Sequence, residues 1–582
     1  MNLKWNLREL YKNNEEFYNE INYVKKLLYE GMNSNVDIND ANDLLFLLNS
    51  EWHIKELANN ILVYGSLMYY KNIKSEECIK LKDDAEKFSN EVNSKLKFIE
   101  NKILTCGKNK IFRLLEENTD LQIYKQHINN LFRLQEHIQK EEINNVIRDN
   151  NNKISEYINK YNKLLRDIDY GQIEVNDETI EINSSNFAKY ISSRDRETRK
   201  KTYLSVDNCF NVKNDEFADL LNNIYGYRIE NSELENYDTV LDKVLSNENI
   251  NPNILKSLIQ SVNNNLPLIQ KYLSLKAEIL KIDDPHLYDF GVPLDNNLKL
   301  KYSMEEAVEI IKNALSPLGE EYLENVEYLL NGHFDAEPDD HKHQSITFSW
   351  NTYSFMNFRG SYNDLKNMIH ELGHIINYSL SKKNLPFIYE DSTIFVGETA
   401  SIVNEILLNR YLYKNAKSTK EKLFYLSKEI ENYFTSVFKQ TMYTEYENEL
   451  YSFRKENDLT KKILSEKYFK LIKKYYGEKI TYDEEASYEW SRLGHLYRWS
   501  YYPYKYATGL IMASVVVNSL IDEKTLSKEQ YMEFLASGSC MYSLDLLKML
   551  NIDLTNSDII NEGFNILKKD VEELEKNLIL KK

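Results

Sequence analysis

Apolar residues recur at intervals of three and four along most of the chain, which places them on one face of an α-helix. The pattern is densest in residues 61–68 and 254–280, where it predicts helices that face a core. Only 16 glycines and 8 prolines occur in 582 residues, so few positions interrupt a helix. No fixed-period repeat indicates a solenoid. The pattern therefore predicts a mainly α-helical protein.

Two short segments have a different pattern, in which polar residues alternate with aromatic or aliphatic ones as they do in strands. These segments are residues 345–350 and 353–358, and Gly360 follows them. They predict a small β-sheet beside the next helix. Residues 174–185 and 331–344 are rich in Asn and Asp and lack helical periodicity, so we expect loops there.

The apolar pattern also bears on location. Charged residues stand near the amino terminus, where a secretory signal has an unbroken apolar stretch. The longest nearly uncharged run, residues 507–521, is too short to cross roughly 30 Å of hydrocarbon, so we expect a buried helix. The four cysteines form no Cys-x-x-Cys pair, which is typical of a reducing compartment. We therefore expect a cytoplasmic protein without a membrane partner.

Charge excludes one class of partner. The chain has 73 Lys and Arg against 91 Asp and Glu, a formal net charge of -18. Proteins that bind phosphate backbones rely on basic residues to displace condensed cations, so we expect no binding to nucleic acid. A hydrophobic content of 42% in a chain of this length predicts a substantial core and two or more lobes. Nothing in the sequence indicates an oligomeric state.

A well-marked helix follows the predicted sheet. Ser361 or Asn363 can cap it, and Asp364 falls in its first turn, where a carboxylate suits the positive end of the helix dipole. Apolar residues continue at helical spacing to about Leu380, so the helix is expected to pack inside the protein. It contains the sequence His-Glu-Leu-Gly-His at residues 370–374.

This five-residue motif has the spacing of a zinc site. His370 and His374 lie one turn apart and can bind one tetrahedral Zn(II). Glu371 points to one side, where its carboxylate can accept a proton from water instead of binding the metal. Two helix histidines without a metal are the alternative, but a chance match is expected on the order of once in a hundred such chains. The motif predicts a hydrolase with one Zn(II) per chain.

Gly373 lies inside the same helix. A glycine in a buried helix costs roughly 1 kcal/mol relative to alanine. Its presence predicts that another backbone, or the substrate, approaches the helix closely at this residue.

A catalytic zinc site needs a third protein ligand and an open position. Residues 394–413 predict a second apolar helix that offers Glu398 and Glu405. Glu398 is favoured because it lies near the start of this helix, while Glu390 and Asp391 in the preceding loop are alternatives. Glu405, two turns further along the same face, can orient a ligand imidazole by accepting its other N–H. An ordinary ion-paired carboxylate fits Glu405 equally well.

Both motifs resemble those of the thimet oligopeptidase family of zinc metallopeptidases, which have an HExGH helix and a downstream ExxSxxxE helix. Here they are His-Glu-Leu-Gly-His at 370–374 and Glu-Thr-Ala-Ser-Ile-Val-Asn-Glu at 398–405. Asp364 resembles the aspartate that precedes the first motif in the oligopeptidase F branch. Further resemblance to that branch covers nearly the whole chain and includes residues 5–11, 237–245, 286–294, 317–322 and 504–509.

The resemblance implies a mainly α fold, in which a two-lobed helical shell surrounds a deep substrate channel beside a zincin-type core with a small β-sheet. An amino-terminal helical lobe would span residues 1–200, and the zinc peptidase domain would span residues 201–582. The implied activity is cleavage of internal bonds in short unfolded oligopeptides. The metal ligands would be His370, His374 and Glu398, with Glu371 as the general base.

The resemblance also suggests a role for a second cluster, which consists of tyrosines around a histidine. Six tyrosines surround His495 between residues 488 and 506, and their alternation favours a loop or a strand. Because the chain has 44 tyrosines, core packing explains any one of them equally well. In the family, a histidine and tyrosines here stabilise the oxyanion. The resemblance assigns this role to His495, Tyr502 and Tyr506, with Tyr504 as the substitute because Arg498-Trp499-Ser500 shifts the register by about one residue.

Three further expectations concern the substrate and the rival functions. A strand near residues 355–358 can pair with a peptide backbone. The enzymatic rival is an HExxH exopeptidase that acts on free peptide ends. The rival from another class is a non-catalytic helical protein that holds zinc for structure and binds a basic partner through its acidic surface.

Overall fold

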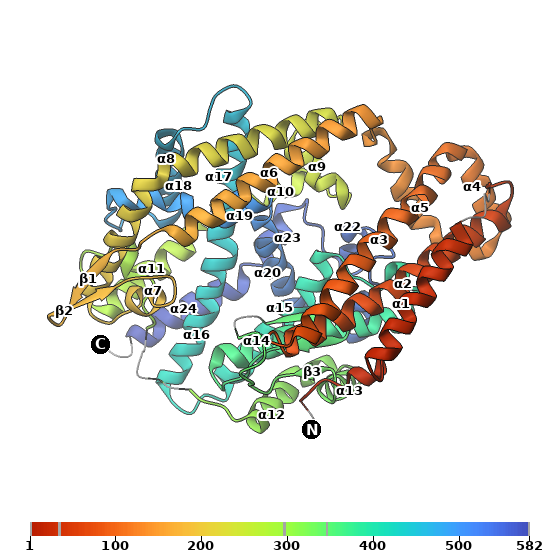
Figure 1. Cartoon of the computed structure of the whole chain (residues 1–582). Helices are drawn as coiled ribbons and strands as arrows, with labels where there is room; N and C mark the ends of the chain where they lie inside the picture. The colour runs from red at the N-terminus through yellow and green to blue at the C-terminus, as the bar shows by residue number, and fades with distance from the viewer. Residues whose placement is uncertain (1–2, 33–36, 295–297, 299, 345–346, 580–582) are drawn as a thin grey trace. The chain divides into compact units, whose positions relative to one another are not determined.

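The computed structural model describes residues 3–32, 37–294, 298, 300–344 and 347–579 (Figure 1). Helices make up most of these residues, so the prediction of a mainly α protein is confirmed. The chain folds into two compact units, each built from three separate stretches. Unit 1 contains Met1–Glu136, Leu300–Leu408 and Ser519–Asn551, and unit 2 contains His137–Lys299, Asn409–Asn518 and Ile552–Lys582. The expected domain boundary near residue 200 stays a prediction.

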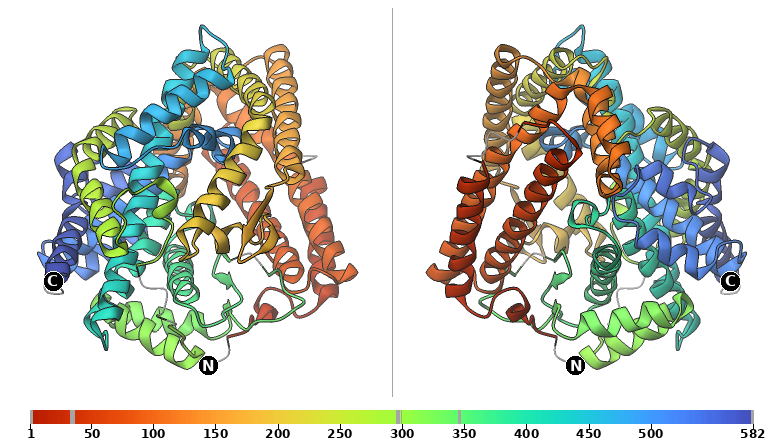
Figure 2. Two further views of the ribbon diagram at one scale, coloured as in Figure 1. Left: turned by 90° about the vertical axis from the view of Figure 1, so that its left-hand side faces the viewer. Right: turned by 90° about the vertical axis from the view of Figure 1, so that its right-hand side faces the viewer.

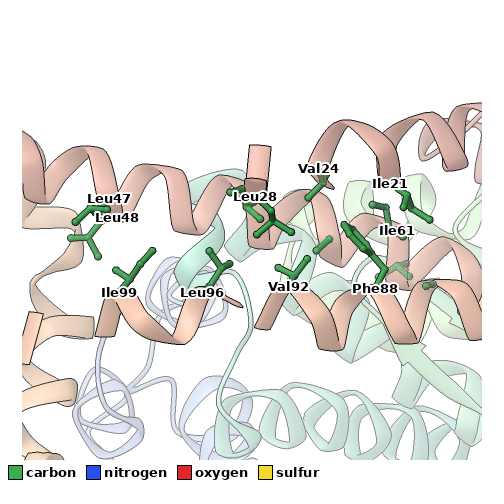
Figure 3. Packing of buried hydrophobic residues seen from close by; sticks show 14 of the residues in the cluster. Ile21, Val24, Leu28, Leu47, Leu48, Ile61, Phe88, Val92, Leu96 and Ile99 are labelled. Atoms are coloured by element: carbon green, nitrogen blue, oxygen red, sulfur yellow. The ribbon is translucent and has the colours of Figure 1, made fainter. Parts of the chain in front are cut away.

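Three long helices, α1 (Asn14–Met32), α2 (Ala41–Lys71) and α3 (Glu76–Cys106), begin unit 1. The buried residues of α3 recur every three or four positions from Leu81 to Ile103, and this stripe packs against α2 (Figure 3). The region from residue 61 that was expected to face a core lies in α2 and contains four fully buried or nearly buried apolar side chains, Ile61, Val63, Tyr64 and Leu67.

The predicted small sheet is confirmed in unit 1. Its strands are β3 (Phe334–Asp335), β4 (Phe348–Trp350) and β5 (Tyr353–Phe355). The order is β3-β5-β4, with β5 parallel to β3 and antiparallel to β4. Ser345 and Ile346, which were expected in the same strand as β4, lie outside the described residues.

The sheet contacts α14 (Tyr362–Asn384), the helix that carries the motif. Ser361 caps it by accepting a hydrogen bond from the Asp364 N–H at 3.1 Å, and the Asp364 carboxylate accepts the Ser361 N–H at 2.9 Å. The predicted start of this helix is therefore confirmed. The second predicted helix is α15 (Ile394–Lys414). The remaining helices of unit 1 are α4 (Lys108–Glu117), α5 (Lys125–Arg133), α12 (Met304–Leu315), α13 (Glu320–Leu330), α21 (Lys528–Leu535) and α22 (Ser543–Lys548).

Unit 2 is a second helical core. Its longest helices, α6 (Glu141–Asp167) and α8 (Arg196–Leu234), lie side by side (Figures 1 and 2). The apolar stretch 254–280 forms two helices, because Pro267 cannot donate a backbone hydrogen bond and starts a new one after Asn265. The helices that complete unit 2 are α7 (Phe187–Ile191), α9 (Val240–Asn247), α10 (Asn253–Asn264), α11 (Leu266–Leu280), α16 (Thr419–Tyr433), α17 (Lys439–Arg454), α18 (Lys461–Tyr476), α19 (Gly494–Arg498), α20 (Pro503–Val517), α23 (Ser557–Glu562) and α24 (Asn565–Ile579).

The loop expected at residues 174–185 is wrong. This segment belongs to an antiparallel hairpin of β1 (Gln172–Val175) and β2 (Glu178–Glu181). Asn176 and Asp177 form the two-residue turn with positive φ angles of 51° and 64°, which Asn and Asp adopt more readily than most residues. The polar residues that suggested a loop are the turn and the exposed face of the hairpin.

One helical stretch, Pro503–Asp522, has the length and apolar composition of a membrane span. It comprises α20 and a final π-helical turn, and 78% of its most apolar window is buried within the protein. Because the core helix of a soluble protein passes the same criteria, this stretch is weak evidence for a membrane. The buried helix expected at residues 507–521 lies within it.

Candidate active site

The helices α14 and α15 meet at Gly373. A Cβ atom on this residue would lie 2.5 Å from Ser401 Cα and 2.8 Å from the Ser401 backbone nitrogen. Such distances are too short for two carbon or nitrogen atoms, so a side chain here would force the two helices apart. The predicted close approach at Gly373 is confirmed, and the approaching group is the backbone of α15. This contact lets the first turns of α15 lie against the motif.

Three side chains converge beside this contact. The Nε2 atoms of His370 and His374 are 3.1 Å apart, and the donor atoms of His370, His374 and Glu398 all lie within 4.8 Å of one another. Two nitrogen atoms that bind one tetrahedral Zn(II) at about 2.1 Å lie about 3.4 Å apart. Two imidazoles and one carboxylate are also the ligand types of catalytic zinc sites. The donor set therefore fits a zinc ion, and neither Glu390 nor Asp391 is part of it.

Glu405 holds one of the imidazoles. Its carboxylate lies 2.7 Å from His370 Nδ1 and 3.0 Å from Lys366 Nζ. Burial opposes its charge, but Lys366 and His370 outweigh burial and lower the pKa of Glu405 to about 2. Burial likewise opposes protonation of His370, whereas Glu405 raises the pKa of His370 to about 9. With Nδ1–H bonded to Glu405, His370 Nε2 faces His374, where a metal ion would take the place of its proton.

Glu371 is buried at the same place, with 8% of its surface exposed. Burial raises the pKa of its carboxyl above the usual range, which suits a group that must accept a proton near neutral pH. Ser349, on β4, makes a hydrogen bond to Glu371 Oε2 and lies 3.2 Å from the Glu371 carbonyl oxygen. Ser349 was not among the residues singled out in the sequence. Its only sequence signal was its place in a predicted strand beside the motif helix.

The strand expected to bind a peptide is already paired. The N–H groups of Met356 and Phe358 donate to the carbonyl oxygens of Asp335 and Ala336, both at 3.0 Å. Because β5 is the central strand, it has no free edge for a peptide. The expectation is therefore wrong for Phe355, while it stays a prediction for residues 356–358, which extend beyond the pairing with β4. Among the described residues, β4 pairs with β5 alone, so its other edge is available.

The tyrosine cluster lies in unit 2 and is mainly helical. A 3₁₀ helix covers Glu484–Arg492, α19 follows, and α20 begins at Pro503, so the loop or strand expected here is wrong for these segments. Residues 499–502, which include Tyr501 and Tyr502, form a loop as expected. The alternation of aromatic residues did not indicate a strand, because three of the six tyrosines are buried in the core. Those with at most 2% of their surface exposed are Tyr497, Tyr501 and Tyr504.

Tyr502 and Tyr506 remain nearer the surface. They are one helical turn apart at the start of α20, and their rings are 5.4 Å apart. Tyr506 has 39% of its surface exposed. Tyr504 points into the core, where burial raises the pKa of its hydroxyl. This arrangement favours Tyr502 and Tyr506 over Tyr504 as groups that contact a substrate.

His495 is the third predicted member of this cluster. Its ring lies 5.6 Å from that of Tyr443, and its Nε2 is buried without a hydrogen-bond partner among the described residues. Burial, reinforced by the charge of Arg498, lowers the pKa of His495, so the imidazole is neutral at pH 7. A neutral imidazole with a free ring nitrogen can donate one hydrogen bond to an oxyanion.

Buried Glu447 and half-buried Arg228, which the sequence analysis did not single out, fix the loop between α19 and α20. Tyr501 has a positive φ of 51°, and its N–H donates to Glu447 Oε1 at 2.9 Å. Arg228 donates to the carbonyl oxygens of Leu496 and Tyr497 at 3.1 and 2.7 Å. These bonds hold the backbone on both sides of the loop that joins His495 to Tyr502. The pairing of this cluster with the metal donors of unit 1 stays a prediction.

Known proteins resemble this chain over its full length. Oligopeptidase PepF of Bacillus subtilis is 27% identical over 99% of this chain and 87% of its own length. An oligoendopeptidase F homolog of Borreliella burgdorferi is also 27% identical, over 99% of this chain and 98% of its own.

Solved structures agree with these relatives. A protein of Chlamydophila abortus has a TM-score of 0.92 and 26% identity, covering 99% of this chain and 98% of its own. Oligoendopeptidase-F of Enterococcus faecium has the same fold, with a TM-score of 0.74 and 22% identity over 97% of this chain and 99% of its own. The model of peptidase family M3 matches residues 189–566, more than half of the chain. The chain therefore belongs to peptidase family M3.

Proposed function

We propose that this protein is a zinc-dependent endopeptidase that hydrolyses internal bonds of short oligopeptides. One observation carries the proposal: the donor atoms of His370, His374 and Glu398 converge beside the buried carboxylate of Glu371. The oligopeptidase names of its relatives support oligopeptides as the substrate class. We further propose that it acts in the cytoplasm.

His370, His374 and Glu398 would hold the metal, and Glu405 would keep the His370 ring in position. Zinc at such a site supplies Lewis acidity, which lowers the pKa of water and polarises a carbonyl group. Glu371 would take the proton from the attacking water and then deliver it to the departing amine nitrogen. The raised pKa of Glu371 suits both proton transfers. A carboxyl of ordinary pKa would lose the proton to solvent before the amine nitrogen could accept it.

The oxyanion needs neutral hydrogen-bond donors. His495, Tyr502 and Tyr506 would provide them, since the imidazole is neutral and the phenol groups donate without carrying charge. Glu447 and Arg228 would act as positioning residues, because they bind the backbone that carries these donors and contact no substrate. The peptide backbone would pair with the free edge of β4, next to Ser349 and Glu371.

A peptide blocked at both ends tests this function. We expect the purified protein to cleave an acetylated and amidated peptide of about ten residues, and we expect a chelator to stop cleavage until zinc is restored. Mass spectrometry of the products locates the cleaved bond. Activity confined to peptides with a free end would favour the exopeptidase. Stoichiometric zinc without any cleavage, combined with unfolding on chelation, would favour the non-catalytic zinc protein.

A further inference from the structure

Unit 2 contains a cavity of about 470 Å³, and none of its lining residues is a metal donor. Its walls come from α7, α8, α11, α16, α17 and α18, together with the segment around Tyr288 and Phe290 and the 3₁₀ helix Glu484–Arg492. Six tyrosines line it: Tyr203, Tyr272, Tyr288, Tyr443, Tyr468 and Tyr476. Cavities of this size with aromatic walls and a few charged groups are typical of sites for small molecules.

The charges on the wall are unbalanced. Four cationic side chains line the cavity and only two carboxylates do so. Glu431 Oε1 lies 2.7 Å from Lys276 Nζ, and its Oε2 lies 2.9 Å from Lys428 Nζ. Arg492 is 2.5 Å from Asp207, which lies behind the wall, and 3.2 Å from Glu489. These three cations therefore have carboxylate partners, in a protein whose net charge is -18.

Lys439 is the fourth cation, and it differs from the others. No carboxylate lies within 4.0 Å of its Nζ in the part of the chain that the structure describes. Tyr443 and Tyr476 are its main electrostatic neighbours, and the Phe434 ring is 5.8 Å away. The side chain is half-buried at the start of α17. Glu489 attracts Lys439 more weakly, from beyond contact distance. A half-buried cation without a carboxylate in contact is stabilised by an anion that enters beside it.

We propose that this cavity binds the carboxylate of a small ligand with an apolar or aromatic body. Lys439 provides the ion pair, hydroxyl groups of neighbouring tyrosines donate hydrogen bonds, and the aromatic wall covers the body. Tyr443 connects the cavity to the proposed oxyanion cluster, because its ring also packs against His495. The source of the ligand rests on the proposed function: an endopeptidase releases a peptide with a new carboxylate at each turnover.

Isothermal titration calorimetry with the full-length zinc protein tests the site. The probes are N-acetyl-phenylalanine and its amide, which differ in charge and hardly in shape. We expect the acid to bind at least tenfold more tightly than the amide. A third probe, N-acetyl-glutamate α-amide, carries its carboxylate on the side chain. Whether it or N-acetyl-phenylalanine has the lower Kd identifies whether the site prefers an acidic side chain or a chain end.

Variants assign the binding to Lys439. Lys439→Met should weaken binding of the acid at least tenfold, and Lys439→Arg should keep it within threefold. Lys428→Met is the matched control, because Lys428 lines the same cavity but is paired with Glu431, and it should change binding less than threefold. Binding that persists in Lys439→Met would overturn the proposal, because it would place the carboxylate elsewhere, for example on the metal.

Two further results would also overturn it. One is equal binding of acid and amide to the unaltered protein, a comparison that holds even if Lys439→Met fails to fold. The other is Lys439-dependent binding of inorganic phosphate without binding of either acid. Peptide cleavage, measured on the same preparations, separates the two proposals. If the unaltered protein binds the acid through Lys439 but cleaves no peptide, the endopeptidase proposal is contradicted and the cavity proposal is supported.

Discussion

Ser349 illustrates what single residues contribute to the proposed site. Its hydroxyl contacts the Glu371 carboxylate, although 22 positions separate the two residues in the chain. The motif itself was predictable, because two histidines one turn apart and a glutamate beside them are a local pattern. The contact with Ser349 was not, since it depends on how β4 packs against α14. For Glu405 the sequence left an orienting role and an ordinary ion pair equally open, because its contact with His370 depends on how α15 packs against α14.

Removing this hydroxyl should lower turnover without affecting metal binding. Ser349→Ala leaves the Glu371 carboxylate free to rotate, and we expect kcat to fall about tenfold while KM and zinc content hardly change. Ser354→Ala is the matched control, because Ser354 is the cross-strand neighbour of Ser349 on β5 and its hydroxyl bonds to the Phe348 carbonyl oxygen instead. Steady-state kinetics on a blocked peptide measures both. Equal kcat values for the two variants would contradict the positioning role.

At the scale of elements, predictions succeeded where the signal lies within one element. The start of α14 followed from Ser361 and Asp364, which form a capping box within four residues. The hairpin of β1 and β2 was missed, although Asn176 and Asp177 form a two-residue turn of a recognised type. Its strands are only four residues each and exposed on one face, so composition outweighed alternation. The helices after Tyr488 were not predicted, because the burial of their tyrosines is not visible in the sequence.

The contact between α14 and α15 yields a direct test. Gly373→Ala places a methyl group on the backbone of Ser401, and we expect it to lower the free energy of unfolding by about 1–3 kcal/mol. Gly397→Ala is the matched control on the facing helix, where the new atom would lie 3.7 Å from His374 Nδ1 at ordinary contact distance. That variant should change stability by no more than about 1 kcal/mol. Urea unfolding compares them, and a Gly373→Ala variant as stable as the unaltered protein would refute the tight contact.

For the whole molecule, the sequence predicted the helical class correctly and could not predict which stretches of the chain form each compact unit. Each unit gathers three stretches that are far apart in the chain, for example Met1–Glu136 and Leu300–Leu408 in unit 1. Composition changes little along the chain, so no linker marks these joins. The division follows from long-range packing, which periodicity within a helix does not encode.

One buried histidine should contribute to the pH dependence of the free energy of unfolding. Burial lowers the pKa of His127 to about 4, with a smaller contribution from Lys55. The unfolded chain binds a proton near pH 6.5 and the folded chain does not, so this stabilisation is present above pH 6.5 and is lost as pH falls toward 4. His127→Gln should remove about 2 kcal/mol of the decrease in unfolding free energy between pH 7.5 and pH 5. Denaturant unfolding at both pH values measures it, and an unchanged pH dependence in the variant would contradict the buried neutral state.

The central claim is that Glu371 is the general base of a zinc peptidase, and the Glu371→Gln variant tests it most directly. Two quantities are measured together: cleavage of a blocked peptide and zinc bound per chain. Because glutamine cannot accept the proton, we expect kcat to fall by a factor on the order of 10² to 10⁴. Zinc should remain at one per chain, since His370, His374 and Glu398 are untouched. Turnover within tenfold of the unaltered enzyme, at full zinc content, would contradict the claim.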